Sequence, residues 1–201
     1  MSDEIKKNPN KGVEKLLVTT NKTVFTTSDL NKIWQLANYR SLIRKINYYS
    51  KKGKLKKIKR GVYSIPERPV NEIELANKLR SPSYISFETA LHNEGIIFQW
   101  DKRITLASKA SESININGAT TLFRKIKEEI LLNSKGIKKE NNYFIADKER
   151  ALLDMIYINP KFSFDNLRSV DFKKCRNYLS IYKRKSLEKK VSKLEKYAES
   201  Y

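Results

Sequence analysis

Three carboxylates close together in the sequence could support metal-dependent cleavage of a phosphodiester bond. Asp147, Glu149 and Asp154 have the side chains that hold a divalent cation, and Lys148 lies among them. The same spacing also suits a helix start, with Asp147 as N-cap and Glu149 in the first turn. Arg150 would then pair with Asp154 one helical turn later. Capping and pairing account for every charge of this segment, and a nuclease is the alternative.

The sequence offers little other catalytic chemistry. His92 is the single histidine, so no multi-histidine metal site or proton relay can form. Cys175 is the single cysteine, which excludes an internal disulfide and favours a buried thiol in a reducing compartment. None of the six glycines belongs to a phosphate-binding loop motif. We therefore expect no catalytic residue, metal or cofactor.

The basic residues suggest a different chemistry, the binding of phosphate. The chain of 201 residues carries a formal net charge of +20. Residues 1–70 contain 17 Lys and Arg against 5 Asp and Glu, a net of +12, whereas residues 71–201 have 25 against 17, a net of +8. Ten basic residues and no acidic residue lie between Arg40 and Arg60. A local field of this sign favours a polyanion as partner.

The elements around this basic stretch follow from its apolar pattern. Between residues 38 and 52, Tyr39, Leu42, Ile46 and Tyr49 recur at helical spacing and predict one buried helix face. Gly53 should end that helix as its C′ residue. Two strands, residues 55–59 and 62–65, follow and are joined through Arg60 and Gly61.

Upstream, the pattern predicts a short helix, an extended piece and a helix over residues 29–36 capped by Thr27 or Ser28. Three helices followed by a two-stranded hairpin are the order of a winged helix-turn-helix. A disordered tail would not interleave apolar residues so regularly, and a membrane-surface helix would not be interrupted by Gly53 and Gly61.

The DNA-contacting residues are predicted from this arrangement. The N-terminal turns of a recognition helix reach base edges, and Arg can pair with guanine through two hydrogen bonds. Lysines of the helix end and of the hairpin should contact phosphate, which gives affinity without sequence choice. The candidates for base edges or adjacent backbone are Arg40, Ser41, Arg44, Lys45 and Tyr48, and those for phosphate are Lys51, Lys52, Lys57, Lys59 and Arg60.

The fold class expected is α+β, in three parts. Residues 1–10 form a flexible lead, residues 11–69 a winged helix-turn-helix domain, and residues 70–201 a mixed α+β domain. That second domain should contain a helix at 87–93, strands near 84–86, 103–107, 113–116, 120–126 and 143–145, and a helical C-terminal tail from Asp165. No stretch has the length of apolar sequence that spans a bilayer, and a cytoplasmic protein is expected.

Three segments, GKLKKIKRGVYSI at 53–65, SPSYISFETALHNEGI at 81–96 and ADKERALLDMIY at 146–157, together resemble the AbiEi family of antitoxins. These are transcriptional regulators of type IV toxin–antitoxin and phage-defence operons, and the resemblance covers roughly residues 11–160. It implies a repressor whose winged helix binds inverted repeats in double-stranded DNA upstream of its own operon. It also implies that the second domain helps to counteract a nucleotidyltransferase-type toxin. The tail beyond residue 182 is more basic than a packing helix requires.

Two alternatives from other functional classes stay open at the level of sequence. The first is the metal-dependent nuclease of a defence system. The second is an RNA-binding or protein-binding module, because winged helices also bind RNA and protein partners.

Overall fold

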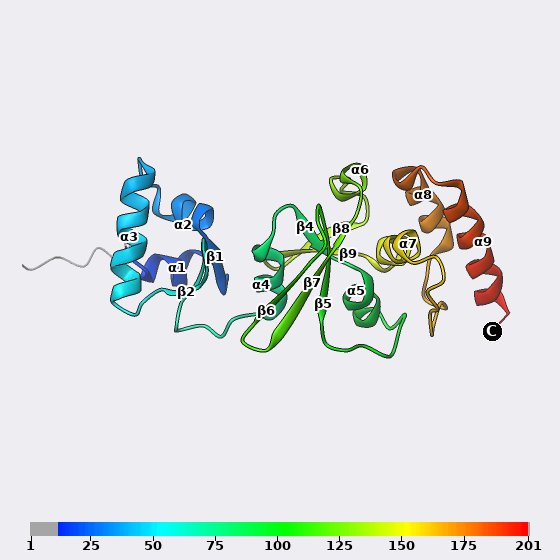
Figure 1. Ribbon diagram of the computed structural model, residues 1–201, viewed down its shortest axis with the longest axis horizontal. Coiled ribbons are helices and arrows are strands. Elements are labelled where there is room, and N and C mark those ends of the chain that lie inside the picture. The colour runs from blue at the N-terminus through cyan, green and yellow to red at the C-terminus, as the bar shows by residue number, and fades with distance from the viewer. Residues whose placement is uncertain (1–11, 201) are drawn as a thin grey trace, which may run out of the picture. The chain divides into compact units, whose positions relative to one another are not determined.

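The computed structural model describes residues 12–200, which divide into two compact units on either side of the Leu79–Arg80 peptide bond. Each unit has its own strands and helices (Figure 1). The chain is mixed α+β and ends in two helices, which confirms the expected fold class at this level. The expected lead at residues 1–10 lies outside the described residues. Within the described part, no helix is long and apolar enough to cross a membrane.

Unit 1 has four helices and a three-stranded sheet in its described part. Its helices are α1 (Glu14–Thr19), α2 (Thr27–Trp34), α3 (Tyr39–Lys51) and α4 (Glu72–Leu79). Its strands are β1 (Val24–Thr26), β2 (Lys56–Lys59) and β3 (Val62–Ser64), which pair antiparallel in the order β1-β3-β2. The hydrophobic core contains Leu16, Phe25, Leu30, Trp34, Leu42, Ile46, Leu55 and Ile65.

Local signals fix the start of α2 and the end of α3. Thr26 caps α2 in a capping box with Asp29, one residue before the expected cap at Thr27 or Ser28. The strand β1 runs directly into α2, so its last residue, Thr26, has the extended backbone of an N-cap, and its hydroxyl accepts the Asp29 N–H at 3.1 Å. Gly53 ends α3 as predicted, with φ +69°. Lys54 N–H donates to Tyr49 O at 3.0 Å, and Gly53 N–H to Ser50 O at 3.1 Å.

The helix α4 packs with unit 1, although residues 70–79 were expected in the second domain. It contacts β1, and buried Glu74 accepts hydrogen bonds from Thr23 N–H at 3.0 Å and from Thr23 Oγ1 at 2.8 Å. The contacts therefore divide the chain after Leu79. The prolines that follow β3 lie in a connection inside unit 1.

Unit 2 is built on a six-stranded mixed sheet of order β6-β7-β5-β4-β9-β8. Its strands are β4 (Ser83–Ile85), β5 (Ile104–Ser108), β6 (Glu112–Ile116), β7 (Ala119–Lys125), β8 (Ile137–Glu140) and β9 (Tyr143–Ala146). Its helices are α5 (Phe87–Asn93), α6 (Glu128–Leu131), α7 (Lys148–Ile158), α8 (Phe172–Tyr182) and α9 (Lys185–Glu199). The predicted strands and the helix at 87–93 are confirmed, whereas β8 and α6 were not anticipated.

Helices α7, α8 and α9 pack in succession at one end of unit 2 (Figure 1). The C-terminal tail is helical as expected, but its first helix begins at Phe172 and not at Asp165. Asp165 is instead bound to the segment after α5: its N–H donates to Ile96 O at 3.0 Å, and its carboxylate accepts from Phe98 N–H at 2.7 Å. These hydrogen bonds hold the backbone before α8 in a loop.

Candidate nucleic-acid interface

One face of α3 closes the core of unit 1, and the opposite face is basic. Leu42 and Ile46 are each 2 % exposed. Arg40, Arg44 and Lys51 lie opposite them on the same stripe of the helix, because they are four and seven residues apart, and all three are exposed. The structure thus brings these predicted site residues together on one surface.

The prediction that Tyr39 shares the buried face is wrong. Its side chain is 71 % exposed. Tyr39 is the first residue of α3, so it extends past the core that Leu42 and Ile46 join one turn later. Tyr49, at the other end of the predicted stripe, is partly buried and packs on Trp34 with ring centroids 5.8 Å apart.

Ser41 and Lys45 lie on the flank of the basic stripe and are partly buried. Ser41 N–H donates to the Asn38 side chain, which caps α3, at 2.8 Å. The Lys45 ammonium lies 4.7 Å from the centre of the Trp34 ring, where a cation–π interaction holds it. Tyr48 is 57 % exposed beside the stripe, with its ring against Tyr49. The predicted base-contacting residues therefore form two groups. Arg40 and Arg44 are exposed on the basic stripe, whereas Ser41, Lys45 and Tyr48 lie on its flank and contact other residues of unit 1.

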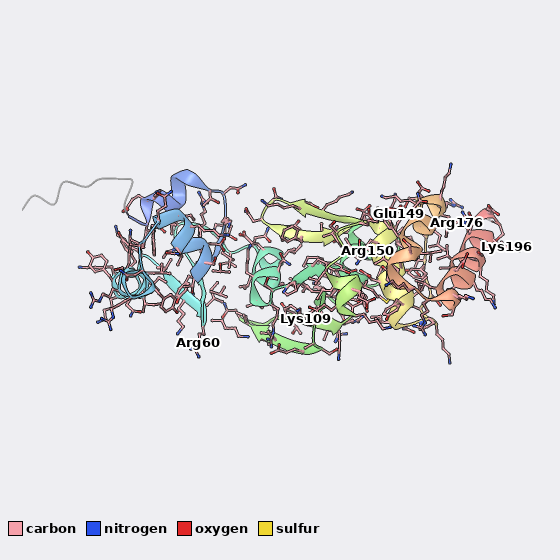
Figure 2. All side chains as sticks on the ribbon, turned by 90° about the horizontal axis from the view of Figure 1, so that it is seen from above. Arg60, Lys109, Glu149, Arg150, Arg176 and Lys196 are labelled. Carbon is pink, nitrogen blue, oxygen red and sulfur yellow. The ribbon has the colours of Figure 1, made fainter. Side chains whose placement is uncertain are left out.

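The β2–β3 hairpin presents the second group of basic residues. Lys57, Lys59 and Arg60 are exposed, and Arg60 lies at the end of the hairpin (Figure 2). Gly61 follows with φ +79°, a conformation that a residue with a Cβ adopts only at a cost. Its carbonyl accepts the Thr27 N–H at 3.0 Å, which ties the hairpin to the start of α2. The hairpin is thereby positioned relative to the helices of the same unit.

The arginines of α3 and the basic residues of the hairpin form no ion pair within the described residues. Lys54, between α3 and the hairpin, pairs with Glu14 at 3.2 Å. Among the described residues, no ion pair involves Arg40, Arg44 or the exposed lysines of α3 and the hairpin. The first turn of α3 contains no acidic residue. Arg40 therefore lies at the positive end of the helix dipole and one turn before Arg44. The dipole and the Arg44 charge both repel the positive charge of Arg40. A bound polyanion would relieve this repulsion.

Two exposed residues of this surface were not singled out from the sequence. Asn47 lies on the basic stripe of α3, three residues after Arg44 and four before Lys51. An Asn side chain can bond adenine through two hydrogen bonds. Lys56 begins β2 and is also exposed. The helical period of the stripe could have identified Asn47, but a search for cations passes over it.

The carboxylates that suggested a nuclease are bound to protein groups. Asp147 caps α7 by accepting Arg150 N–H at 2.9 Å, as predicted. Lys174 Nζ lies 3.0 Å from an Asp147 oxygen and 2.9 Å from a Glu149 oxygen. Asp154 is fully buried and pairs with Arg150 Nε at 3.2 Å, so the predicted i, i+4 pair is confirmed. Each oxygen of these three carboxylates accepts a hydrogen bond from the protein, and no metal-binding cluster occurs among residues 12–200.

Arg150, which is labelled in Figure 2, forms with Asp154 the centre of a buried polar cluster in unit 2. Asp154 accepts hydrogen bonds from Tyr84 OH at 2.9 Å, Ser86 Oγ at 2.8 Å and Tyr182 OH at 2.6 Å. Burial raises the pKa of Asp154, and the Arg150 guanidinium and the three hydroxyls oppose that rise. These contacts join β4, α7 and α8, which gives the cluster a structural role.

Cys175 is fully buried in α8, in agreement with the sequence prediction. Burial, reinforced by the nearby Glu149 and Asp147 carboxylates, raises the pKa of the thiol to about 12. A thiol in this state is a poor nucleophile.

No model of a known protein family matches the chain, and no curated protein sequence is significantly similar to it.

Proposed function

We propose that this protein is a sequence-specific DNA-binding repressor that acts as the antitoxin of a type IV toxin–antitoxin system. The observation that carries the proposal is the acid-free basic stripe of α3, which faces away from the core and is followed in the chain by a basic hairpin. The element order of unit 1, with β1 between the first two helices and a hairpin after the third, supports a winged helix-turn-helix.

In the proposed complex, α3 enters the major groove. Arg40 and Arg44, in its N-terminal half, would donate to the O6 and N7 acceptors of guanine, and Ser41 would contact a neighbouring base or phosphate. Lys51, Lys52 and the three basic residues of the hairpin would contact phosphates and set the register of the helix. Lys45 and Tyr48 would touch the edge of the interface.

The antitoxin role rests on the resemblance of three segments to the AbiEi family. In this proposal the protein acts in the cytoplasm and binds inverted repeats upstream of its own operon. Unit 2 contributes to counteracting a nucleotidyltransferase-type toxin. The carboxylate contacts of α7 support a role without catalysis, because Asp147, Glu149 and Asp154 serve as cap and ion-pair partners.

The proposal is tested by measuring how two substitutions in α3 change binding to a duplex selected from a random pool. Arg44→Ala should cost about 1–3 kcal/mol on the selected site and relax its sequence preference. Lys51→Ala should weaken binding to all duplexes similarly and reduce the salt slope by about 1. Arg80→Ala, in unit 2, is the control and should bind as the unaltered protein does. Equal effects of the Arg44 and Arg80 substitutions would contradict the proposal.

A further inference from the structure

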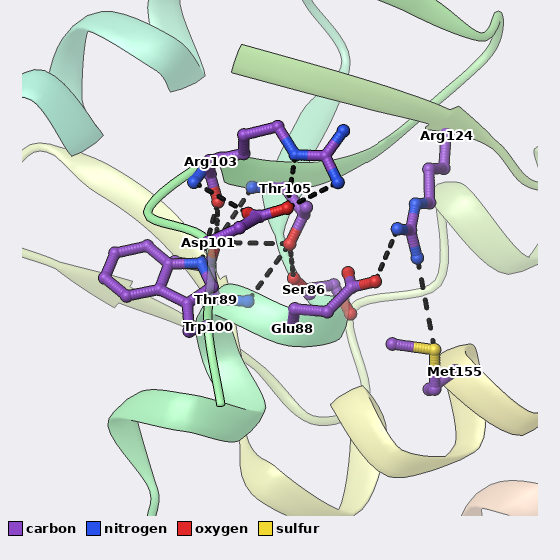
Figure 3. A network of polar contacts seen from close by, with 9 residues as sticks. All are labelled: Ser86, Glu88, Thr89, Trp100, Asp101, Arg103, Thr105, Arg124 and Met155. Atoms are coloured by element: carbon purple, nitrogen blue, oxygen red, sulfur yellow. Dashed lines mark hydrogen bonds and ion pairs between the residues drawn. The ribbon is translucent and has the colours of Figure 1, made fainter. Parts of the chain in front are cut away.

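A polar pocket in unit 2 lies apart from the carboxylates and the basic surface discussed so far. Its volume is about 360 Å³, and it lies between α5, the loop that precedes β5, and β7. The lining residues are Glu88, Gln99, Trp100, Asp101, Arg103, Thr105 and Arg124. Figure 3 shows Glu88 between the Arg124 side and the Trp100–Arg103 side of the pocket.

The floor of the pocket is rigidly built. Thr105 Oγ1 donates to Ser86 O at 2.8 Å, and the backbone N–H of Thr89 donates to Thr105 Oγ1 at 3.1 Å. In return, Thr105 N–H donates to Thr89 Oγ1 at 2.8 Å. All three residues are at most 2 % exposed. Ser86 also donates to Asp154, so the floor is continuous with the buried cluster of α7.

The deep side of the pocket has an acceptor without a donor. Glu88 Oε1 accepts from Arg124 Nη2 at 2.5 Å, whereas Glu88 Oε2 is buried and has no hydrogen-bond partner among the described residues. An unsatisfied buried carboxylate oxygen is costly and calls for a partner. Arg124 Nη1 points to Met155 Sδ at 4.0 Å, and sulfur is a weak acceptor. The Glu88–Arg124 pair therefore has one unpartnered acceptor, Oε2, and one weakly used donor, Nη1.

The mouth of the pocket has a cation and a flat apolar surface. Arg103 binds Asp101 through Nε and Nη2, and its side chain is 50 % exposed. The Trp100 indole donates to Arg103 O at 2.9 Å and packs on His92 with ring centroids 5.0 Å apart, so its position is fixed. A guanidinium binds phosphate, and an indole face stacks on a nucleobase.

We propose that this pocket binds an adenine mononucleotide. Adenine presents a 6-amino donor next to a ring-nitrogen acceptor, an edge that side chains with paired acceptor and donor recognise. The 6-amino group would donate to Glu88 Oε2 once the half-buried carboxylate turns this oxygen into the pocket, and Arg124 would donate to the ring nitrogen. The phosphate would lie on Arg103 at the mouth, with the base against Trp100. The site lies within unit 2 and does not depend on DNA binding by unit 1.

Calorimetric titration of the full chain at near-physiological salt tests the proposal with AMP, IMP and inorganic phosphate. IMP has the 6-amino donor replaced by a carbonyl acceptor, so it should bind roughly tenfold more weakly than AMP. Glu88→Gln should remove this preference because an amide can donate to the carbonyl. Three results would overturn the proposal: equal affinity for AMP and IMP, an affinity for inorganic phosphate equal to that for AMP, or no binding of AMP.

Matched arginine variants separate the pocket from the basic surfaces elsewhere in the chain. Arg103→Ala should weaken AMP binding roughly tenfold or more through loss of a charge-assisted contact. Arg80 is also 50 % exposed and also pairs with one carboxylate, that of Glu112. Arg80→Ala should therefore leave AMP affinity unchanged. Both variants change half-exposed side chains, and unaltered circular dichroism would verify the fold. AMP binding that is insensitive to Arg103→Ala would overturn the proposal.

Discussion

Reversing the charge at Arg40 should stabilise unit 1 and weaken DNA binding at the same time. Arg40 lies in the first turn of α3, where the helix dipole opposes a positive charge, and Arg44 follows one turn later. In Arg40→Glu both interactions change sign. A helix-end charge contributes about 0.3–1 kcal/mol and an i, i+4 pair about 0.2–0.5 kcal/mol. Because each contribution changes from unfavourable to favourable, it counts twice, and we expect the free energy of unfolding to rise by about 1–3 kcal/mol at low ionic strength.

Trp34 fluorescence during urea denaturation measures this change in unit 1. Trp34 is buried in the core of that unit, and the second tryptophan of the chain, Trp100, belongs to unit 2. Replacing Trp100 with Phe throughout leaves Trp34 as the single tryptophan signal. The stabilisation should decline at high salt because exposed charges are screened. The same variant should bind duplex DNA at least roughly tenfold more weakly, since it loses one contact and gains a repulsion.

Lys32→Glu is the matched control, because it makes the same charge change at an exposed site in the last turn of α2. A negative charge is unfavourable at that end of a helix, so this variant should be less stable than the unaltered chain. If Arg40→Glu destabilises unit 1, or stabilises it no more than Lys32→Glu does, the electrostatic account of the basic stripe is refuted.

Three further substitutions test contacts that stabilise the fold of unit 1 or the fold of unit 2. Gly53→Ala should destabilise unit 1 by about 1 kcal/mol in the same denaturation assay, because φ +69° strains a residue with a Cβ and nothing lies within 4 Å to add a clash. The loss of folding stability caused by Asp29→Asn should become smaller as pH falls. Burial alone would raise the pKa of Asp29, but the hydrogen bonds from Lys22 and Thr26 outweigh burial and lower that pKa. The carboxylate therefore stabilises the fold fully above its unfolded pKa of about 4. This stabilisation is lost as pH falls through the lower pKa of the folded state. Arg150→Met should lower the stability of unit 2 by about 3–5 kcal/mol in calorimetry, because it leaves Asp154 charged or protonated in a dry site; an unchanged melting temperature would contradict that cluster's role.

The parts of the fold that sequence predicted are those set by local signals. The period of Leu42 and Ile46 and the glycine at position 53 define α3 because each acts within one or two helical turns. Tyr39 has the same spacing, but periodicity does not indicate where the core ends. The edge strand β8 was missed because its residues, IKKE, are mostly exposed and show no apolar alternation. Lysines on an edge strand protect it from pairing, and they also hide it from a pattern search.

The candidate sites divide in the same way. The basic stripe could be predicted because its charges are contiguous in sequence and need no distant partner. The burial of Asp154 could not, since it depends on Tyr84 and Tyr182, which are 70 and 28 residues away. The pocket around Glu88 likewise combines residues of α5, a loop and β7, which only the paired strands β5 and β7 bring together.

The measurement that tests the central claim most directly is fluorescence anisotropy with duplex DNA taken from immediately upstream of this protein's own gene. A shuffled duplex of equal composition serves as the reference, and both are titrated across a salt series. A repressor should prefer the upstream duplex roughly a hundredfold or more near physiological salt. Equal and steeply salt-dependent affinity for the two duplexes would mean that α3 and the hairpin hold phosphate without reading sequence, and would contradict the account.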